Sequence, residues 1–220
     1  MNNLPRVIAI DGPSASGKGA VAQRVAQSLG WHYLDSGSLY RLVALAADNN
    51  GVSWSDADAL EKLARQLDVK FHSGNIILDN HMIDDQLRTE HCGKGASTVA
   101  LHPQVREALL KRQQAFRLSP GLVADGRDMG SVVFPDAALK IFMTATAETR
   151  AARRHKQLKE KGIVATLEAL LHDLNERDAR DQARSVAPLR QEPDARLLDT
   201  THLSIEEAVG KVIDWHGATV

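Results

Sequence analysis

The amino-acid sequence predicts an α/β protein built on a central parallel sheet of five strands with helices on both faces. Two observations lead to this prediction. Short apolar runs alternate with amphipathic helical segments along most of the chain, and strands that are linked through helices pair in parallel. A glycine-rich turn also joins the first apolar run directly to a helical segment. The expected strands are residues 7–10, 31–35, 122–125, 139–143 and 196–199.

The first strand is followed by the spacing Gly-x-x-x-x-Gly-Lys, from Gly12 to Lys18, and then by a helical run at 20–26. This arrangement binds a phosphate chain, because the glycines let backbone N–H groups converge on an anion and the helix start adds free donors. Lys18 would reach the outer phosphates of a nucleoside triphosphate. Gly19 stands where a Mg²⁺-binding Ser or Thr is usual. The alternative is a glycine-rich turn with an exposed lysine.

Further helices follow from the spacing of apolar residues and from residues that cap helix starts. We expect Ser36 to cap a helix over 39–47, and Ser53 or Ser55 to open one that ends near Leu67. Thr166 begins a helix that extends to 184, and Ser204 caps the last one. The remaining helical segments are 94–100, 105–116 and 148–161.

Residues 69–93 interrupt the strand–helix series. Alternating residues at 69–72, an apolar run at 76–78 and residues 81–84 are separated by the turns 73–75 and 79–80, which is typical of a small antiparallel meander. Insertions of this length are usually functional, so we expect the segment to cover a substrate. A surface hairpin without a function is the alternative.

The composition is that of an ordinary globular protein. The chain has 220 residues, of which 43% are hydrophobic and 25% charged, and its net charge is −1. The balanced charge argues against a general nucleic-acid or membrane surface. With a lone cysteine, Cys92, an internal disulfide is excluded. The N-terminal segment does not resemble a signal peptide, and we expect a cytoplasmic protein that binds neither nucleic acid nor membrane.

Acidic residues end three of the predicted strands, at Asp11, Asp35 and Asp125. Ligands bind beyond the carboxyl ends of parallel strands, so we expect these carboxylates to line one crevice. There they would suit Mg²⁺, hydroxyl groups or arginine partners. Each of them could instead cap a helix.

Arginines are the second notable feature of these regions. Phosphoryl transfer depends on positioning and on cations that share the negative charge, and arginine offers a forked donor for phosphate oxygens. A phosphate acceptor is already a nucleophile near neutral pH, so no general base is required. A solvated face with Arg–Asp pairs at helical spacing is the alternative for the helical arginines. The residues concerned are Arg41, Arg127, Arg150, Arg153, Arg154, Arg177, Arg180 and Arg184.

With these motifs the chain resembles the bacterial cytidylate kinases (CMP/dCMP kinases) over nearly its full length. Together the matching stretches are far more specific than the phosphate loop alone, which many nucleotide-binding families share. They are residues 10–14, 34–37 with Tyr40 and Arg41, 105–110, 124–130 with 133–135, 176–178 with Arg180, Asp181 and Arg184, and 187–189.

The resemblance implies a three-layer P-loop kinase fold that forms a single domain over 1–220. Its core would comprise 1–68, 94–147 and 182–220, with a nucleoside-monophosphate-binding insertion at about 69–93 and a short helical lid at about 148–181. The implied reaction is ATP- and Mg²⁺-dependent transfer of the γ-phosphate to CMP or dCMP. The implied partners are these small nucleotides, no side chain is assigned as a metal ligand, and we expect a monomer.

The resemblance also implies roles for individual residues in the donor and acceptor sites. ATP would be held by Gly12, Pro13, Ser14, Ala15, Ser16, Gly17, Lys18, Gly19 and Ala20. The cytosine edge would be read by Ser97, Arg106 and Asp128, and the sugar region contacted by Ser36 and Asp181. The monophosphate would be held by Arg41, Arg127 and Arg177, with Arg184 nearby as a further substrate-binding residue. The catalytic set would be Lys18, Arg127, Arg177, Arg184 and one lid arginine, Arg153, with Arg150 and Arg154 as the other lid candidates.

Two other functions are compatible with parts of the sequence. One is a related kinase that acts on another small acceptor, such as AMP, UMP or shikimate. The other is a nucleotide-binding regulator that uses its Arg/Lys-rich helix on RNA. The balanced charge and the absence of an Asn-Lys-x-Asp guanine-reading motif argue against the regulator.

Ala20 is the departure from the family pattern, since the resemblance implies a threonine at this position after Lys18 and Gly19. The missing hydroxyl removes one charge-assisted hydrogen bond, which is worth about 1.5–3 kcal/mol, or less where water replaces it. We therefore predict that Ala20→Thr lowers the KM for ATP or raises turnover in a coupled kinase assay. Unchanged kinetics would refute this role for position 20.

Overall fold

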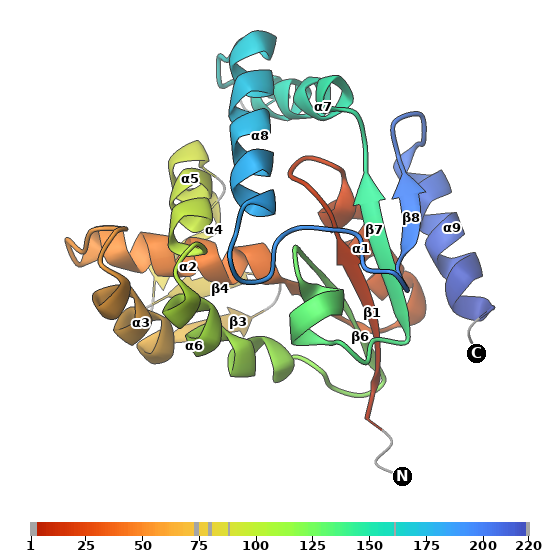
Figure 1. Cartoon of the computed structure of the whole chain (residues 1–220), viewed down its shortest axis with the longest axis horizontal. Coiled ribbons are helices and arrows are strands. Elements are labelled where there is room, and N and C mark those ends of the chain that lie inside the picture. The colour runs from red at the N-terminus through yellow and green to blue at the C-terminus, as the bar shows by residue number, and fades with distance from the viewer. Residues whose placement is uncertain (1–3, 73–74, 79–80, 88, 161, 219–220) are drawn as a thin grey trace. The chain divides into compact units, whose positions relative to one another are not determined.

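The computed structural model describes residues 4–72, 75–78, 81–87, 89–160 and 162–218 (Figure 1). The chain divides into two compact units. The first unit comprises Met1–Leu34 and Phe116–Val220, and the second comprises Asp35–Ala115. The predicted insertion at 69–93 lies within the second unit.

A five-stranded sheet forms the centre of the first unit, with the strand order β2-β6-β1-β7-β8. The central strand β1 (Arg6–Asp11) pairs in parallel with β6 (Gly121–Gly126) and with β7 (Leu139–Thr144). At one edge β8 (Arg196–Asp199) is parallel to β7, and β2 (His32–Asp35) occupies the other edge. The predicted α/β class and all five predicted strands are confirmed.

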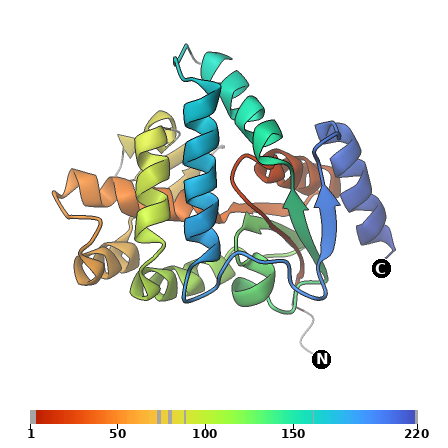
Figure 2. The ribbon, with the colours of Figure 1, turned by 45° about the horizontal axis from the view of Figure 1, so that its top comes forward.

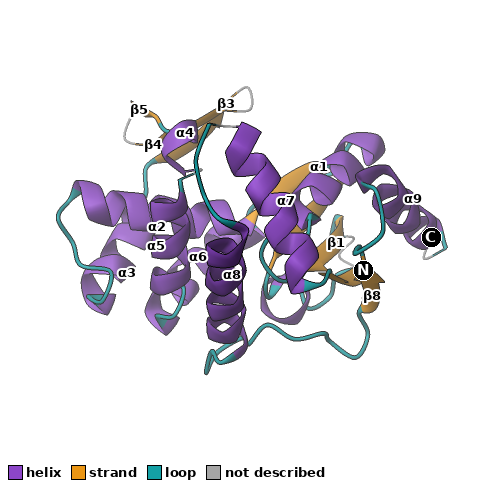
Figure 3. Ribbon diagram, turned by 90° about the horizontal axis from the view of Figure 1, so that it is seen from above, coloured by secondary structure: helices purple, strands orange, loops and turns teal. Residues whose placement is uncertain are grey.

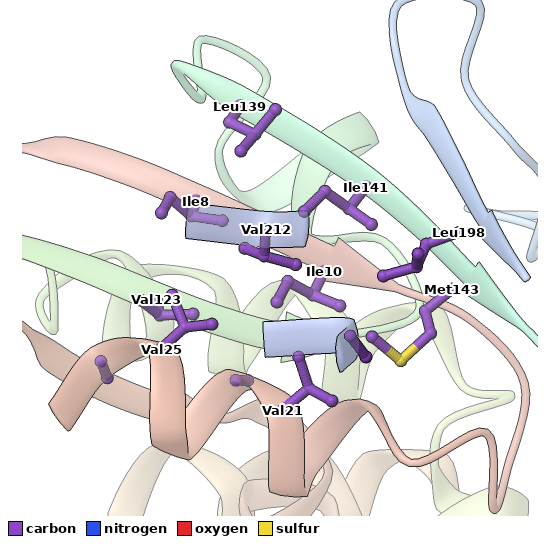
Figure 4. Close-up of a cluster of buried hydrophobic side chains, with 13 residues drawn as sticks. Ile8, Ile10, Val21, Val25, Val123, Leu139, Ile141, Met143, Leu198 and Val212 are labelled. Carbon is purple, nitrogen blue, oxygen red and sulfur yellow. The ribbon is translucent and has the colours of Figure 1, made fainter. Parts of the chain in front are cut away.

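One face of this sheet is covered by α1 (Lys18–Leu29) and α9 (Ile205–Gly217), which pack against each other and against the strands. Figure 4 shows Ile8 and Ile10 of β1 directed at the same cluster as Val212 of α9. The side chains in this cluster are fully or almost fully buried. The burial of this apolar face supplies the main hydrophobic stabilisation of the sheet.

The opposite face of β1 contacts a short π-helix, η1 (Met129–Val133). Successive side chains of a strand point to opposite faces, so Asp11 points away from the face of Ile8 and Ile10. Its carboxylate accepts hydrogen bonds from the first two residues of η1. We did not predict η1, because π-helical turns have no characteristic pattern of apolar residues. Such turns are rare and are frequent at functional sites.

Two helices of the first unit, α7 (Ala147–Glu160) and α8 (Leu167–Gln182), form a helical hairpin (Figure 2). Their contact is a small apolar cluster that includes Ala151 and Leu174. The predicted helix start near Thr166 is confirmed, and the side chain of Thr166 caps α8, accepting a hydrogen bond from a backbone N–H in its first turn. None of the helices in the described part of the chain is long and apolar enough to cross a membrane.

The second unit is mainly helical. Its helices are α2 (Ser36–Asn49), α3 (Ala57–Gln66), α4 (Asp84–Leu87), α5 (Glu90–Val99) and α6 (Pro103–Gln114). The tightest helix pair is α2 with α5, where the absence of a side chain at Gly95 lets Trp54 and Ala44 approach closely.

Two predicted caps in this unit are wrong by one to three positions. The cap of α2 is Asp35, whose carboxylate accepts from Ser38 N, and Ser36 is the first helical residue. The cap of α3 is Asp56, not Ser53 or Ser55. Ser and Asp cap helices about equally well, so a sequence with both side by side does not decide between them.

The antiparallel meander is confirmed in the described residues. It comprises β3 (Val69–His72), β4 (Asn75–Leu78) and β5 (His81–Met82), paired in that order (Figure 3). Asn75, which we placed in the first turn, is the first residue of β4. The other predicted turn residues, at 73–74 and 79–80, lie outside the described residues.

Candidate functional site

The predicted phosphate loop lies between β1 and α1, where its mechanism requires it. Gly12 permits the chain to leave the sheet, because a Cβ at this position would lie 2.0 Å from the carbonyl oxygen of Met143. Ala15 has a left-handed backbone with φ 58°, which is uncommon for a residue with a side chain and typical of strained functional loops. Gly17 is also left-handed and precedes the first turn of α1.

Cationic side chains bind the carbonyl groups of this loop. Lys18 Nζ donates to Pro13 O at 3.3 Å, and Arg153 Nη1 donates to Ser16 O at 3.0 Å. Arg150 Nη1 donates to Ser14 O at 3.2 Å. The loop is therefore surrounded by positive charge on the side where its carbonyls point.

Ser16 adds a polar group that fits a ligand. Its side chain is 1% exposed, and its hydroxyl oxygen makes no hydrogen bond with the described residues. A buried hydroxyl without a partner costs free energy, and a bound water, ion or ligand is one way in which that cost is removed. An oxygen-rich anion in the loop would satisfy it.

Arg150 and Arg153 of α7, two of the predicted lid candidates, contact more than the loop. Arg150 is buried, and it also donates to Ala145 O and forms an ion pair of 2.6 Å with Asp178 of α8. Arg153 also donates to the hydroxyl of Thr200, which in turn bonds Ser16 O. Burial lowers the pKa of Arg153, although Asp199 opposes this. These contacts link α7 to the loop through Arg150 and Arg153.

Arg154, the third lid candidate, contacts its own helix. Its Nη1 donates to Gln157 Oε1, one turn further along α7, at 3.2 Å. The hydrogen bonds of Arg150 and Arg153 to loop carbonyls make these two residues a link between α7 and the loop. The sequence could not rank the three arginines, because they follow one another on the same helix.

Arg127 connects the end of β6 to both α8 and the phosphate loop. Its Nε donates to Asp181 Oδ2 at 2.7 Å, and its Nη2 donates to Ser14 Oγ at 2.8 Å. Arg184 forms an ion pair with the other carboxylate oxygen of Asp181. The structure therefore brings together three residues that we predicted for the acceptor nucleotide, and joins them to a residue that we predicted for ATP.

The charges in this network are mutually stabilised. Burial alone would raise the pKa of Asp181, but Arg127 and Arg184, with a further contribution from Arg177, hold it below its usual value. Burial would likewise lower the pKa of Arg127, but Asp181 raises it above the ordinary value. The charged forms of Asp181 and Arg127 therefore stabilise each other, and Arg184 and Arg177 add positive charge around the same carboxylate.

Asp11 serves the fold of the site rather than offering an open carboxylate. Its two oxygens accept from Met129 N and Gly130 N, each at 2.8 Å, and the side chain is buried. Burial raises the pKa of Asp11 to about 6, although the two N–H groups and Arg127 lower it and Asp128 raises it further. The expectation that Asp11 lines a crevice as a free ligand is corrected: the capping alternative holds for Asp11, as it does for Asp35.

Asp125 lies beside the start of α1. Its Oδ1 accepts from the hydroxyl of Tyr33 at 3.0 Å, and its Oδ2 would lie 3.6 Å from a Cβ placed on Gly19. Asp11 is the last residue of β1, and Asp125 is the last but one residue of the neighbouring strand β6. Asp125 is therefore the strand-end carboxylate that stands next to the phosphate loop. Among the described residues no group of three or more metal-ligating side chains occurs.

In the second unit, Ser36 and Arg41 of α2 both have defined partners. Ser36 Oγ donates to Gln113 Oε1 at 2.9 Å, and both side chains are buried. Arg41 Nη1 donates to the backbone oxygens of Leu87 and Thr89, so it holds the start of α5. We did not predict Gln113, although it continues the buried face of α6 four residues after Leu109, a signal that could have found it.

Ser97 and Arg106, the predicted base-reading residues of this unit, are both buried. The hydroxyl of Ser97 makes no hydrogen bond with the described residues, which is the second buried hydroxyl suited to a ligand. The guanidinium of Arg106 lies over the ring of Tyr40, with 5.9 Å between its central carbon and the ring centroid. Tyr40 therefore fixes Arg106 by a cation–π contact that we did not predict.

Comparisons with known proteins agree with these features. A family model described as cytidylate kinase matches residues 8–217. The chain is 60% identical to the cytidylate kinase of Chromobacterium violaceum, over 95% of this chain and 94% of that one. It is 55% identical to the cytidylate kinase of Cupriavidus necator (98% and 97% covered) and 57% identical to that of Burkholderia ambifaria (96% and 93% covered).

The raised pKa of Asp11 predicts that the folded protein becomes less stable as the pH rises. Its carboxyl has a pKa of about 6 in the folded protein against an ordinary value of 3.8, so the folded state holds the proton more tightly than the unfolded chain does. The free energy of unfolding therefore falls between about pH 4 and about pH 6, by roughly 3 kcal/mol for a shift of about two pKa units.

The measurement is urea unfolding of the wild type and of Asp11→Asn across this pH range. The wild type is expected to lose its stability advantage relative to the variant as the pH rises, whereas the exposed control Asp58→Asn should follow the wild type. A difference between wild type and Asp11→Asn that stays constant from about pH 4 to about pH 7 would contradict this assignment.

Proposed function

The chain belongs to the cytidylate kinase family, and we propose that it transfers the γ-phosphate of ATP to CMP or dCMP, with Mg²⁺ bound, to give ADP and CDP or dCDP. It is a kinase that acts on small nucleotides. The structural observation that supports the proposal most strongly is the position of Arg127. This residue bonds the phosphate-loop side chain of Ser14 and the carboxylate of Asp181 at the same time, so cations for a second phosphate group lie beside the phosphate loop.

The loop residues 12–20 are the proposed donor site. Backbone N–H groups of a glycine-rich loop and of a helix start bind phosphate oxygens. The buried hydroxyl of Ser16 and the cations Lys18 and Arg153 fit an anion at this place. Arg153 is the lid residue that we propose to act on the transferred phosphate, while the buried ion pair of Arg150 with Asp178 suits a supporting role.

The oxygen ligands available beside the loop also fit Mg²⁺. This ion keeps several waters and is usually bound through one or two carboxylates and the substrate phosphates. Asp125, beside Gly19 at the start of α1, is the carboxylate that we propose to hold it, directly or through water. When bound, Mg²⁺ neutralises charge on the phosphate oxygens.

For the acceptor we propose separate contacts to base, sugar and phosphate. Base recognition is assigned to Asp128, Ser97 and Arg106, because cytosine presents an amino donor next to acceptor groups. The sugar is assigned to Ser36 and Asp181. The phosphate is assigned to Arg41, Arg127, Arg177 and Arg184. In this proposal residues 69–93 are the acceptor-binding insertion and 148–181 the lid of a single kinase domain.

The chemistry requires little beyond positioning and charge. An oxygen of the acceptor phosphate attacks the γ-phosphorus in line, the bond from that phosphorus to the bridging oxygen breaks, and ADP leaves. Lys18 and the arginines share the charge that spreads over the transferred oxygens. No residue is needed to remove a proton, since the attacking phosphate oxygen is already ionised.

We further propose that the protein acts as a monomer in the cytoplasm. A single cysteine, Cys92, which is buried and hydrogen-bonded to Arg41 O, fits a reducing compartment.

A coupled assay with ATP and four acceptors tests the function. CMP and dCMP should be phosphorylated much faster than UMP, and UMP faster than AMP. Arg127→Ala should lower kcat/KM for CMP by at least about 100-fold, because a charge-assisted contact to the phosphate is lost. Asp128→Ala should instead reduce the preference for CMP over UMP.

The exposed arginine Arg65, which pairs with Glu61 on α3, provides the control. Arg65→Ala should behave as the wild type does. A wild-type preference for a purine monophosphate would reject the assignment, and wild-type selectivity in Asp128→Ala would reject the role of this residue.

A further inference from the structure

Asp11 lies at a junction in the first unit. Its backbone ends β1 and leads directly into the phosphate loop at Gly12. Its side chain holds the start of η1, the turn that follows Arg127 and Asp128. The backbone of Asp11 thus adjoins the segment assigned to ATP, and its side chain binds the turn that follows the residues assigned to the acceptor.

We propose that Asp11 is a positioning residue for acceptor selection, which fixes the direction of Asp128 by binding the N–H groups of Met129 and Gly130. The inference rests on the proposed function and adds a residue to which no direct contact with either nucleotide is assigned. This role explains why an acidic residue occupies position 11, although burial disfavours its charged form.

The two hydrogen bonds determine the turn because they use both oxygens of one rigid group. The first N–H groups of a helix have no partner within it, and here they donate to Asp11 at 2.8 Å each. The carbonyl of Asp128 is also engaged, since it accepts from Val132 N and Val133 N. The backbone of Asp128 is therefore held by η1, and η1 is held by Asp11.

Packing around the turn leaves little room for another arrangement. A Cβ on Gly126 would lie 2.9 Å from the side chain of Met129. A Cβ on Gly130 would lie 3.2 Å from Lys140 and 3.5 Å from the carboxylate of Asp11. Because the segments are this close, packing keeps the turn near its place when a hydrogen bond is lost, and the effect falls on the orientation of Asp128 and Arg127 rather than on the fold.

The phosphate loop does not depend on this carboxylate to the same degree. The backbone of Asp11 is held in the sheet, where it is paired with Gly126 on one side and Phe142 on the other. Removal of the side-chain charge leaves these pairs in place. We therefore expect Asp11→Asn to impair acceptor binding and selection and to leave ATP binding nearly unchanged.

Asp11→Asn provides the test, because asparagine has nearly the same size but only one acceptor oxygen. We expect the ratio of kcat/KM for CMP to that for UMP to fall at least tenfold. The KM for CMP should rise at least fivefold, and the KM for ATP should change less than twofold. Val212→Ala, a buried substitution in α9, is the matched control: it should lower the melting temperature and leave the CMP-to-UMP ratio unchanged.

The outcomes separate this inference from the function on which it rests. A wild-type enzyme without preference for CMP would reject the proposed function itself. A selective wild type together with an Asp11→Asn variant of equal selectivity would overturn only the role of Asp11. An equal loss of rate with every acceptor would also overturn it, since that result is expected of a purely structural residue.

If Asp11→Asn does not fold, a second variant and a measurement on the wild type test the same inference. Asp11→Ser is smaller, offers one oxygen, and should show the same loss of selectivity. In the wild type, the amide hydrogens of Met129 and Gly130 should exchange with solvent as slowly as those of β1. Exchange at the rate of an exposed loop would overturn the inference.

Discussion

The functional segments of the first unit depend on one buried ion pair, between Arg127 and Asp181. Charges removed from water are costly unless each is paired and hydrogen-bonded, and this pair meets both conditions. Asp181 binds Arg127 through one oxygen and Arg184 through the other, and Arg127 uses a further nitrogen for Ser14. The end of β6, the helix α8 and the phosphate loop are therefore joined by a single guanidinium group.

A similar set of contacts holds the other side of the loop. Arg153 and Thr200 both bind the carbonyl of Ser16, and Arg150 binds that of Ser14 while it pairs with Asp178 of α8. Side chains of α7 thus bind the loop directly, and α8 supports it through the carboxylates that pair with Arg150 and Arg127. The arginines that we propose for phosphoryl transfer are positioned by contacts with the protein itself, which would reduce the reorganisation required during the reaction.

Much of this organisation can be predicted from the sequence, because strands and helices follow local patterns and the phosphate loop has a fixed spacing. The partners of individual side chains cannot be predicted in this way. The capping role of Asp11 depends on η1, which is distant in the sequence and has no pattern of its own. The bond from Ser36 to Gln113 joins two helices of the second unit, and whether Ser36 or Asp35 caps α2 is decided by tertiary packing.

Arg127 and Asp181 are joined in one charged network, and a double-mutant cycle tests most directly whether they act on the acceptor as one unit. The four proteins are the wild type, Arg127→Ala, Asp181→Ala and the double variant, compared by kcat/KM for CMP. Coupled residues in one network show interaction energies of about 0.5–3 kcal/mol. We predict an interaction energy above about 1.5 kcal/mol between the two residues, so that kcat/KM of the double variant is only slightly lower than that of Arg127→Ala. Additive losses, within about 0.5 kcal/mol, would contradict this claim.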